Sequence, residues 1–272
     1  MSASRLAVLV LPLIMIGCKE KVMDPTSAAY QRLLGISREK WTALADKKVF
    51  FGHQSVGRNI LDGLAIVLER HPSARLEIRE TADPAEFEKP VFAHSPIGRN
   101  RDPKGKIDHF REILDSGVGA KADIAFFKLC YVDIDKDTDV GELSVHFDRT
   151  LADLRERYPG LDIIPVTAPL TNTTPGIKAM VKRLLGRGPD LEADNIKRNA
   201  FNDRVRKTYG ASVWDLADAE ATTAEGAKVV FKAGAGTYRL LNKAYTGDGG
   251  HLNAVGSQIV AIDLLIRLAT LD

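Results

Sequence analysis

The sequence predicts an α/β protein with a mostly parallel, five-stranded sheet that is covered by helices on both faces. Two observations predict this class. Strand-like and helix-like segments alternate along the chain with short connections, as the crossover units of a parallel sheet require. The chain has 272 residues, of which 44% are hydrophobic, so it can bury the core that such a sheet needs.

The first half of the chain contains two predicted strands. Residues 28–45 predict a helical lead-in, and the apolar residues 48–51 predict a buried strand. The helix that follows ends before Pro72 and places four apolar side chains on one face, namely Val56, Ile60, Leu64 and Val67. Residues 75–79 alternate apolar and charged side chains, which is typical of an edge or half-buried strand. Residues 83–103 are expected to be irregular.

The second half continues the alternation. Three further strands are predicted, at residues 123–129, 161–166 and 212–216. One helix carries Ile107, Phe110 and Leu114, and residues 143–158 predict a second, clearly amphipathic helix. The last helix, residues 254–271, is apolar on nearly every side, so we expect it to be buried against the sheet.

A glycine-rich segment near the C-terminus carries an acid and a histidine at a spacing that suits catalysis. Its sequence is Gly-Asp-Gly-Gly-His-Leu-Asn, with Asp248 three residues before His251. The glycines allow one short loop to present both side chains. A hydroxyl nucleophile needs such a pair, because the histidine takes its proton and the acid orients the imidazole. The alternative is an ordinary glycine-rich turn in which Asn253 caps the last helix.

Ser55 is the candidate nucleophile. It follows the first predicted strand and opens a helix, where unpaired N–H groups and the helix dipole favour developing negative charge. The alternative is a plain N-cap, for which serine is a preferred residue. Ligands of parallel α/β sheets bind beyond the carboxyl ends of the strands, and both Ser55 and the Asp248–His251 pair are expected there. The sequence therefore favours a serine hydrolase site.

The chain resembles the SGNH (GDSL-like) hydrolase family. The segment Asp-Gly-Gly-His-Leu-Asn, followed by Gly256, is similar to the final motif of that family, and the order of elements fits from about residue 47 to residue 271. The first motif departs from the family pattern, because residues 52–55 read Gly-His-Gln-Ser where the family usually has Gly-Asp-Ser. The resemblance implies a flavodoxin-like, three-layer α/β/α sandwich.

The resemblance also implies a carboxylic ester hydrolase that works through an acyl-enzyme. Ser55 would be the nucleophile, His251 the base and Asp248 its partner. The substrate would be a small-molecule or glycan ester, for example O-acetyl groups on an envelope polysaccharide. Two alternatives stay open: an O-acyltransferase that uses the same site, and a non-catalytic envelope glycan-binding protein on a hydrolase scaffold.

The oxyanion hole of this family takes donors from the serine backbone, from a glycine after the second strand and from an asparagine after the third. Residues 128–133, which follow the third predicted strand, contain no asparagine. We therefore expect the N–H groups of Ser55 and Gly98 and the side-chain amide of Asn100 to serve, although Asn100 is equally suited to capping a loop. His53 is expected to contact the substrate, or else to pack at the pocket rim.

The first residues predict export. Arg5 precedes the apolar run 6–16, which is about half as long as a membrane span, and the sequence Met-Ile-Gly-Cys that ends at Cys18 resembles a bacterial lipoprotein signal. The predicted organisation is a signal peptide (1–18) ending at a lipidated Cys18, a tether (19–28) and one hydrolase domain (29–272). The domain would then be anchored outside the cytoplasm, on the periplasmic side in a cell with two membranes. The alternative is an ordinary signal peptide cut elsewhere.

Other partners are not indicated. A formal net charge of +2 gives no reason to expect nucleic acid as a partner. The histidines lack both the helical i, i+4 spacing and the nearby cysteines and glutamates of a metal site. Neither glycine-rich stretch continues into the Lys-Ser or Lys-Thr of a phosphate-binding loop. We therefore predict no cofactor, and no oligomeric state is indicated.

Overall fold

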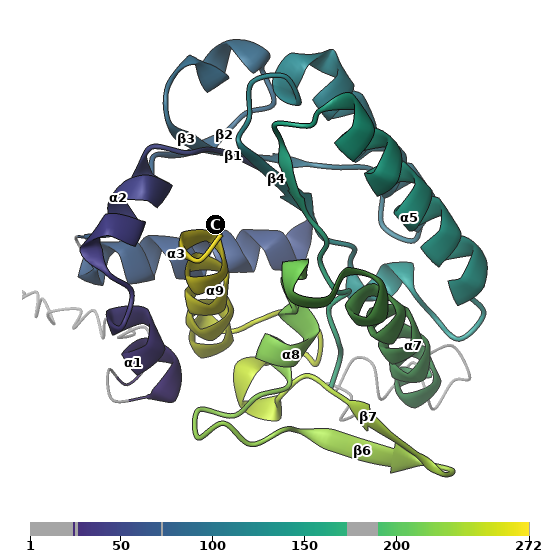
Figure 1. Ribbon diagram of the computed structural model, residues 1–272. Coiled ribbons are helices and arrows are strands. Elements are labelled where there is room, and N and C mark those ends of the chain that lie inside the picture. Colours follow the sequence, from purple (N-terminus) through teal and green to yellow (C-terminus); the bar gives the residue numbers. More distant parts are fainter. Residues whose placement is uncertain (1–23, 25–26, 72, 173–189, 272) are drawn as a thin grey trace, which may run out of the picture.

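A five-stranded parallel sheet forms the centre of the molecule (Figure 1). The computed structural model describes residues 24, 27–71, 73–172 and 190–271. Neighbouring strands follow the order β2-β3-β1-β4-β5, and the pairings between these neighbours are parallel. The strands are β1 (Lys48–His53), β2 (Ile78–Glu80), β3 (Val91–Pro96), β4 (Ile124–Phe127) and β5 (Asp162–Ile164). The predicted α/β class is confirmed.

Helices cover both faces of the sheet (Figure 1). They are α1 (Ala28–Leu34), α2 (Arg38–Ala45), α3 (Ser55–Arg70), α4 (Pro103–Ile113), α5 (Val140–Arg157), α7 (Leu191–Tyr209), α8 (Leu216–Glu220) and α9 (Ala254–Ala269). Helical turns are η1 (Pro84–Glu88), η2 (Leu114–Val118), η3 (Tyr131–Asp133), η4 (Gly210–Ser212) and η5 (Lys243–Tyr245). Helices α1, α2, α3 and α9 share one core with the sheet, and α4, α5 and α7 share the other. The result is a three-layer α/β/α sandwich.

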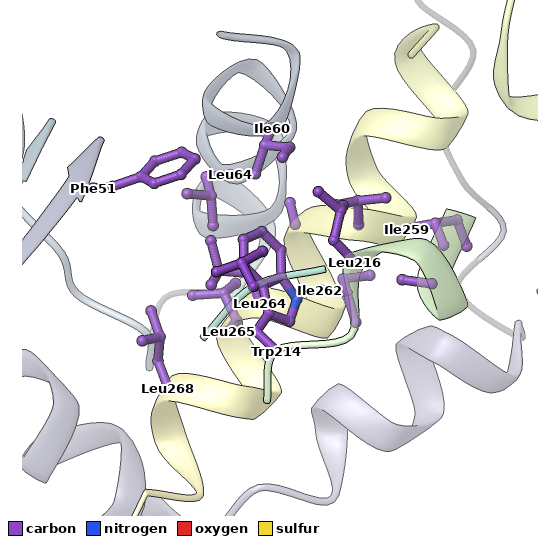
Figure 2. Packing of buried hydrophobic residues seen from close by; sticks show 14 of the residues in the cluster. Phe51, Ile60, Leu64, Trp214, Leu216, Ile259, Ile262, Leu264, Leu265 and Leu268 are labelled. Carbon is purple, nitrogen blue, oxygen red and sulfur yellow. The ribbon is translucent and has the colours of Figure 1, made fainter. Parts of the chain in front are cut away.

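Successive side chains of β1 enter the two cores in turn. Val49 and Phe51 belong to the core under α3 and α9, whereas Phe50 belongs to the core under α4 and α5. This alternation is the two-residue period of a strand that is buried on both faces. Figure 2 shows the first core, where Phe51 and Trp214 lie with the apolar side chains of α3 and α9. The last helix is buried as its composition predicts.

The strand β3 corrects the prediction for residues 83–103, which were expected to be irregular. This strand pairs with β1 on one side and β2 on the other, so it lies inside the sheet. Its apolar stretch is short, from Val91 to Ala93, and prolines at positions 90 and 96 flank a polar His94. Proline removes a ladder donor and usually marks the end of a strand, so the sequence pattern was too short to recognise.

Residues 212–216 are the second correction, because the predicted fifth strand is absent from this segment. Its Trp214 makes one isolated parallel bridge, to Val166. The chain also forms an antiparallel hairpin of β6 (Val230–Ala233) and β7 (Gly236–Arg239), which was not predicted and projects from the sandwich (Figure 1). Among the helices of the described residues, none combines the length and the apolarity of a membrane span.

The strand order places a switch point at β1. The chain moves from β1 to one side of the sheet to build β3, and then returns to the other side to build β4. Apart from the three-residue edge strand β2, this is the order of the first four strands of a flavodoxin-like sheet. Ligands of such sheets bind beyond the carboxyl ends of the strands at this point. The turn between β1 and α3 therefore lies where a ligand of such a sheet would bind.

Candidate active site

Ser55 stands at the turn between β1 and α3. Gln54 is the N-cap of α3 but makes no side-chain cap, because its amide donates to the carbonyl oxygens of Ile97 (2.8 Å) and Gly98 (3.1 Å). Ser55 is the first residue of the helix, and its side chain is exposed. The plain N-cap alternative is therefore wrong for Ser55. Its hydroxyl faces the loop that precedes α9 and carries His251.

That loop is closed on itself between η5 and α9. Thr246 and Leu252 form an antiparallel bridge, and Asn253 caps α9 by accepting the N–H groups of Val255 (3.1 Å) and Gly256 (3.0 Å). Gly249 has a φ of 93°, a conformation that side chains other than glycine rarely adopt. The loop thus contains the ordinary helix cap and the predicted acid–histidine pair together.

The structure brings Ser55, His251 and Asp248 into one hydrogen-bonded chain. The Ser55 Oγ lies 3.1 Å from the His251 Nε2, and the His251 Nδ1 lies 2.7 Å from the Asp248 Oδ2. A carboxylate can only accept, so the proton of the neutral imidazole belongs on Nδ1. Nε2 is then free to accept the proton of the Ser55 hydroxyl. This is the arrangement in which a histidine acts as a general base toward a serine.

The Asp248 carboxylate is kept ionised by its neighbours. Its Oδ1 accepts the backbone N–H groups of Gly250 (2.9 Å) and His251 (2.8 Å). Burial raises the pKa of Asp248, but these N–H groups and the His251 ring outweigh burial and bring the pKa below its usual value. The side chains of Asp248 and His251 are 58% and 40% exposed, so the site is open to solvent.

The oxyanion prediction is only partly compatible with the structure. The Gly98 N–H donates to the Nδ1 of His109 at 2.8 Å, so it is not available to a substrate in this conformation. The Asn100 Oδ1 accepts from Lys106 Nζ at 3.0 Å, and the Asn100 side chain is exposed. The first N–H groups of a helix have no acceptor within the helix, so the Ser55 N–H stays a candidate donor.

The prediction that His53 contacts the substrate is contradicted by its burial. His53 is 2% exposed, and its Nδ1 bonds the Gln54 carbonyl oxygen while its Nε2 lies 3.0 Å from the His94 Nδ1. Burial lowers the pKa of His53 to about 4, which keeps the ring neutral. Its ring also fills the space beside Gly57, where a Cβ would lie 2.3 Å from the His53 Cβ. His53 is therefore a packed side chain at the end of β1, as the alternative interpretation of the sequence expected.

A buried ion pair joins α4, which follows β3, to η3, which follows β4. Lys106 and Asp133 are fully buried, with Nζ 2.6 Å from Oδ2. Asp133 also accepts the backbone N–H groups of Cys130 (2.6 Å) and Arg101 (2.8 Å). Arg101 has a φ of 69°, so this contact helps to hold an uncommon backbone conformation. The network fixes the two loops that flank the carboxyl end of β1.

Tyr131 is a site residue that the sequence analysis missed. It follows β4, and its hydroxyl lies 3.4 Å from the His251 Nδ1. The only signal in the sequence was its position after a predicted strand, in the segment that lacks the family's asparagine. Thr246 is a second missed residue, whose hydroxyl accepts the Gly249 N–H at 2.9 Å. Both residues support the loop that carries His251.

Two further predictions concern cofactors and lipidation. Within residues 24, 27–71, 73–172 and 190–271, no group of three or more His, Cys, Asp or Glu side chains is placed to hold a metal ion. Cys18, the predicted lipidation site, lies outside the described residues.

No family model matches the chain, and no curated protein matches it. Among solved structures, it is similar to a Streptococcus pneumonia protein provisionally described as a platelet activating factor. The identity is 18% and the TM-score 0.49, over 88% of this chain and 95% of that chain. It is also similar to the periplasmic domain of a Salmonella ser. Paratyphi A lipopolysaccharide acetyltransferase, with 12% identity and a TM-score of 0.43, over 86% and 94%. Neither likeness identifies the activity of this chain.

Proposed function

We propose that this chain is a serine esterase that hydrolyses a carboxylic ester through a covalent acyl-enzyme. The observation that carries the proposal is the hydrogen-bonded chain from the Ser55 Oγ through the His251 ring to Asp248, with distances of 3.1 Å and 2.7 Å. The three groups come from opposite ends of the sequence, yet they meet at the carboxyl edge of the sheet in the order that acyl transfer needs.

In the first half-reaction, the Ser55 oxygen attacks the ester carbonyl carbon while His251 Nε2 takes the hydroxyl proton. Asp248 stabilises the imidazolium that forms. The tetrahedral intermediate carries its negative charge on the former carbonyl oxygen, where the Ser55 N–H and the Asn100 amide would donate. Loss of one such donor costs on the order of 3 kcal/mol in barrier height in other enzymes. His251 then gives its proton to the leaving alcohol, and the acyl group stays on Ser55.

In the second half-reaction, water takes the place of the alcohol. His251 accepts a proton from water, the resulting hydroxide attacks the acyl carbon, and Ser55 leaves with the proton that His251 returns. A sugar hydroxyl that replaced this water would make the protein an O-acyltransferase. Product analysis in the presence of an oligosaccharide acceptor separates the two, because transfer consumes the acceptor and hydrolysis does not.

The test of this proposal uses the full chain in detergent. We expect a fluorophosphonate probe to label Ser55 and p-nitrophenyl acetate to be hydrolysed, and Ser55→Ala should abolish both. His53→Gln is not a suitable control because His53 is buried, whereas an exposed change such as Lys232→Gln on the hairpin should leave both unchanged. Absence of labelling together with absence of hydrolysis would reject the esterase. Glycan binding that survives Ser55→Ala without turnover would instead support the non-catalytic alternative.

The location of the enzyme is part of the proposal. The apolar run 6–16 and the Met-Ile-Gly-Cys sequence ending at Cys18 support export and lipid attachment. An exported esterase on a membrane would meet envelope glycans, so we propose O-acyl groups on such a glycan as the substrate. The open site accords with a polymeric substrate, because Asp248 and His251 remain more than one-third exposed.

A further inference from the structure

Tyr131 packs directly against the catalytic histidine. The two ring centroids are 5.5 Å apart, and the ring planes meet at 81°, an edge-to-face contact of the kind that aromatic pairs favour. The Tyr131 hydroxyl lies 3.4 Å from the His251 Nδ1. The His251 side chain is 40% exposed, and the Tyr131 ring covers one side of it.

The loop that carries His251 is shaped to admit this ring. A Cβ on Gly250 would lie 2.6 Å from the Tyr131 Cζ and 3.0 Å from the Tyr131 hydroxyl oxygen. Gly250 has no positive φ, unlike its neighbour Gly249 with a φ of 93°. Glycine is therefore favoured at position 249 by the backbone conformation, whereas at position 250 it leaves room for the Tyr131 side chain.

The backbone of Tyr131 is fixed by contacts with buried residues. It opens the short helix η3, whose Asp133 is locked by Lys106 and by the Cys130 N–H. Its carbonyl oxygen accepts from the Nε of Arg198 at 2.7 Å, and Arg198 is 2% exposed. The backbone of Tyr131 thus belongs to a rigid buried network, whereas His251 belongs to a more exposed loop.

We propose that Tyr131 is a positioning residue, whose ring holds the His251 imidazole in the orientation that Ser55 and Asp248 require. This inference rests on the proposed esterase function. The ring carries the effect rather than the hydroxyl, because the Nδ1 proton is already committed to Asp248 at 2.7 Å and the hydroxyl contact is much longer at 3.4 Å. A loose His251 would spend part of its time out of reach of the Ser55 hydroxyl.

The first test compares Tyr131→Ala with Tyr131→Phe in the full chain. We expect Tyr131→Ala to lower kcat by about 10- to 100-fold while KM changes by less than about twofold, since misplacement of a reacting group by about 1 Å can cost about 100-fold. Tyr131→Phe keeps the ring and should retain kcat within about threefold of the wild type. Full kcat in the Ala variant, or an equal loss in the Phe variant, would overturn the inference.

The second test approaches the same contact from the opposite side. Gly250→Ala pushes the far end of a movable side chain, so it should displace the Tyr131 ring with little loss of stability and lower kcat by about tenfold. In the Tyr131→Ala background the three atoms nearest to the added methyl group, which all belong to the Tyr131 side chain, are gone, and Gly250→Ala should then cost less than about twofold. Gly247→Ala is the matched control, because a Cβ there has no neighbour within 4 Å. Additive effects of the two substitutions would contradict the contact.

A spectroscopic measurement separates this inference from the proposed function. The hydrogen-bonded Nδ1–H proton of His251 should give a far-downfield proton resonance in the wild type and in Tyr131→Phe. In Tyr131→Ala we expect that resonance to broaden or vanish, because the ring moves and water reaches the bond. The resonance does not depend on turnover, so a wild type without esterase activity would reject the function alone. An unchanged resonance in Tyr131→Ala would reject the positioning role alone.

Discussion

The Asp248 carboxylate accepts the backbone N–H groups of Gly250 and His251 as well as the proton of the His251 ring. Burial alone would raise its pKa, but these donors bring the pKa below the usual value. Because the pKa is lowered in the folded protein, the carboxylate stays charged as the pH falls through the mildly acidic range. The stability that the charged carboxylate contributes is lost only below its ordinary pKa. The acid therefore does not limit the pairing with His251 near neutral pH.

Asp248→Asn tests the orienting role at this position. An asparagine can turn its NH2 group toward Nδ1, which would move the imidazole proton to Nε2 and leave no acceptor for the Ser55 hydroxyl. We expect kcat for p-nitrophenyl acetate to fall by about 10³- to 10⁴-fold, with KM little changed. Fluorophosphonate labelling of Ser55 should slow in parallel. A loss of less than about tenfold would show that Asp248 does not hold the tautomer.

Glu220 offers a prediction of stability rather than activity. Burial raises its pKa to about 8 from an ordinary value of 4.5, against the opposing Leu170 N–H and the charges of Lys128 and Arg198. Between these two values the folded state holds a proton that the unfolded chain releases. The stabilisation is therefore fully present below about pH 4.5 and declines as the pH rises to about 8.

Glu220→Gln removes this titration while it keeps an oxygen for the Leu170 N–H, which Glu220 accepts at 2.7 Å. We expect the variant to gain stability over the wild type by on the order of 1–3 kcal/mol between about pH 5 and about pH 8. Urea unfolding curves of both proteins at the two pH values measure the change. A stability difference that does not depend on pH would mean that Glu220 is ionised in the folded protein.

At the scale of elements, the contact between α3 and α9 sets the distance across the site. Ser55 is the first residue of α3, and α9 begins at Ala254, three residues after His251. The two helices are in close contact at Gly63, where a Cβ would lie 2.2 Å from the Ser257 carbonyl oxygen. Two helices that carry the two halves of the site at their N-terminal ends must keep a fixed separation.

Gly63→Ala is predicted to disturb both stability and catalysis. In an isolated helix the change would stabilise by about 0.5–1 kcal/mol, but here the methyl group meets backbone that cannot move aside. We expect a net loss of about 1–3 kcal/mol in the free energy of unfolding and a lower kcat at a temperature where the variant is folded. Gly160→Ala is the control, because a Cβ at Gly160 has no neighbour within 4 Å. Equal stabilities of the two variants would show that α3 and α9 can move apart.

At the scale of the whole molecule, periodicity was sufficient for the layers and for most strands. The apolar runs of β1 and β4 and the stripe on α3 are dictated by burial on both faces of the sheet, so sequence alone could show them. The strand β3 escaped because prolines and His94 interrupt it, and its place beside β1 comes from tertiary pairing. Residues 212–216 were predicted as a strand, but the buried Trp214 makes only a single bridge, to Val166.

The candidate site was foreseeable in part for a similar reason. Ser55, Asp248 and His251 belong to local motifs, and topology predicted that these motifs meet. The Gly98 N–H and His53 were assigned to the site from their positions in the chain, but in the structure each bonds another histidine, His109 and His94 respectively. The contact of Tyr131 with His251 spans 120 positions and depends on packing alone. Such contacts leave no trace in a single sequence.

Membrane attachment is the remaining prediction at this scale. Expressed from the full chain in a lipoprotein-processing bacterium, the wild type should partition into the detergent phase of a cloud-point separation. Cys18→Ser should remove the thiol that carries the lipid, so the protein moves to the aqueous phase or stays with an uncleaved leader. Esterase activity per molecule should be unchanged, because Cys18 is not one of the residues of the candidate site. A wild type found in the aqueous phase would reject the lipid anchor.

The exposure of the Asp248 and His251 side chains, 58% and 40%, has a consequence for the fate of the acylated serine. If Ser55 is acylated as proposed, bulk solvent can reach the acyl group and competes with any other acceptor. The proposed esterase would then hydrolyse its acyl group unless a sugar acceptor were bound before the acyl group arrives. A centre that is this open would also select weakly by shape, so the choice of substrate would depend largely on where the proposed lipid anchor places the protein.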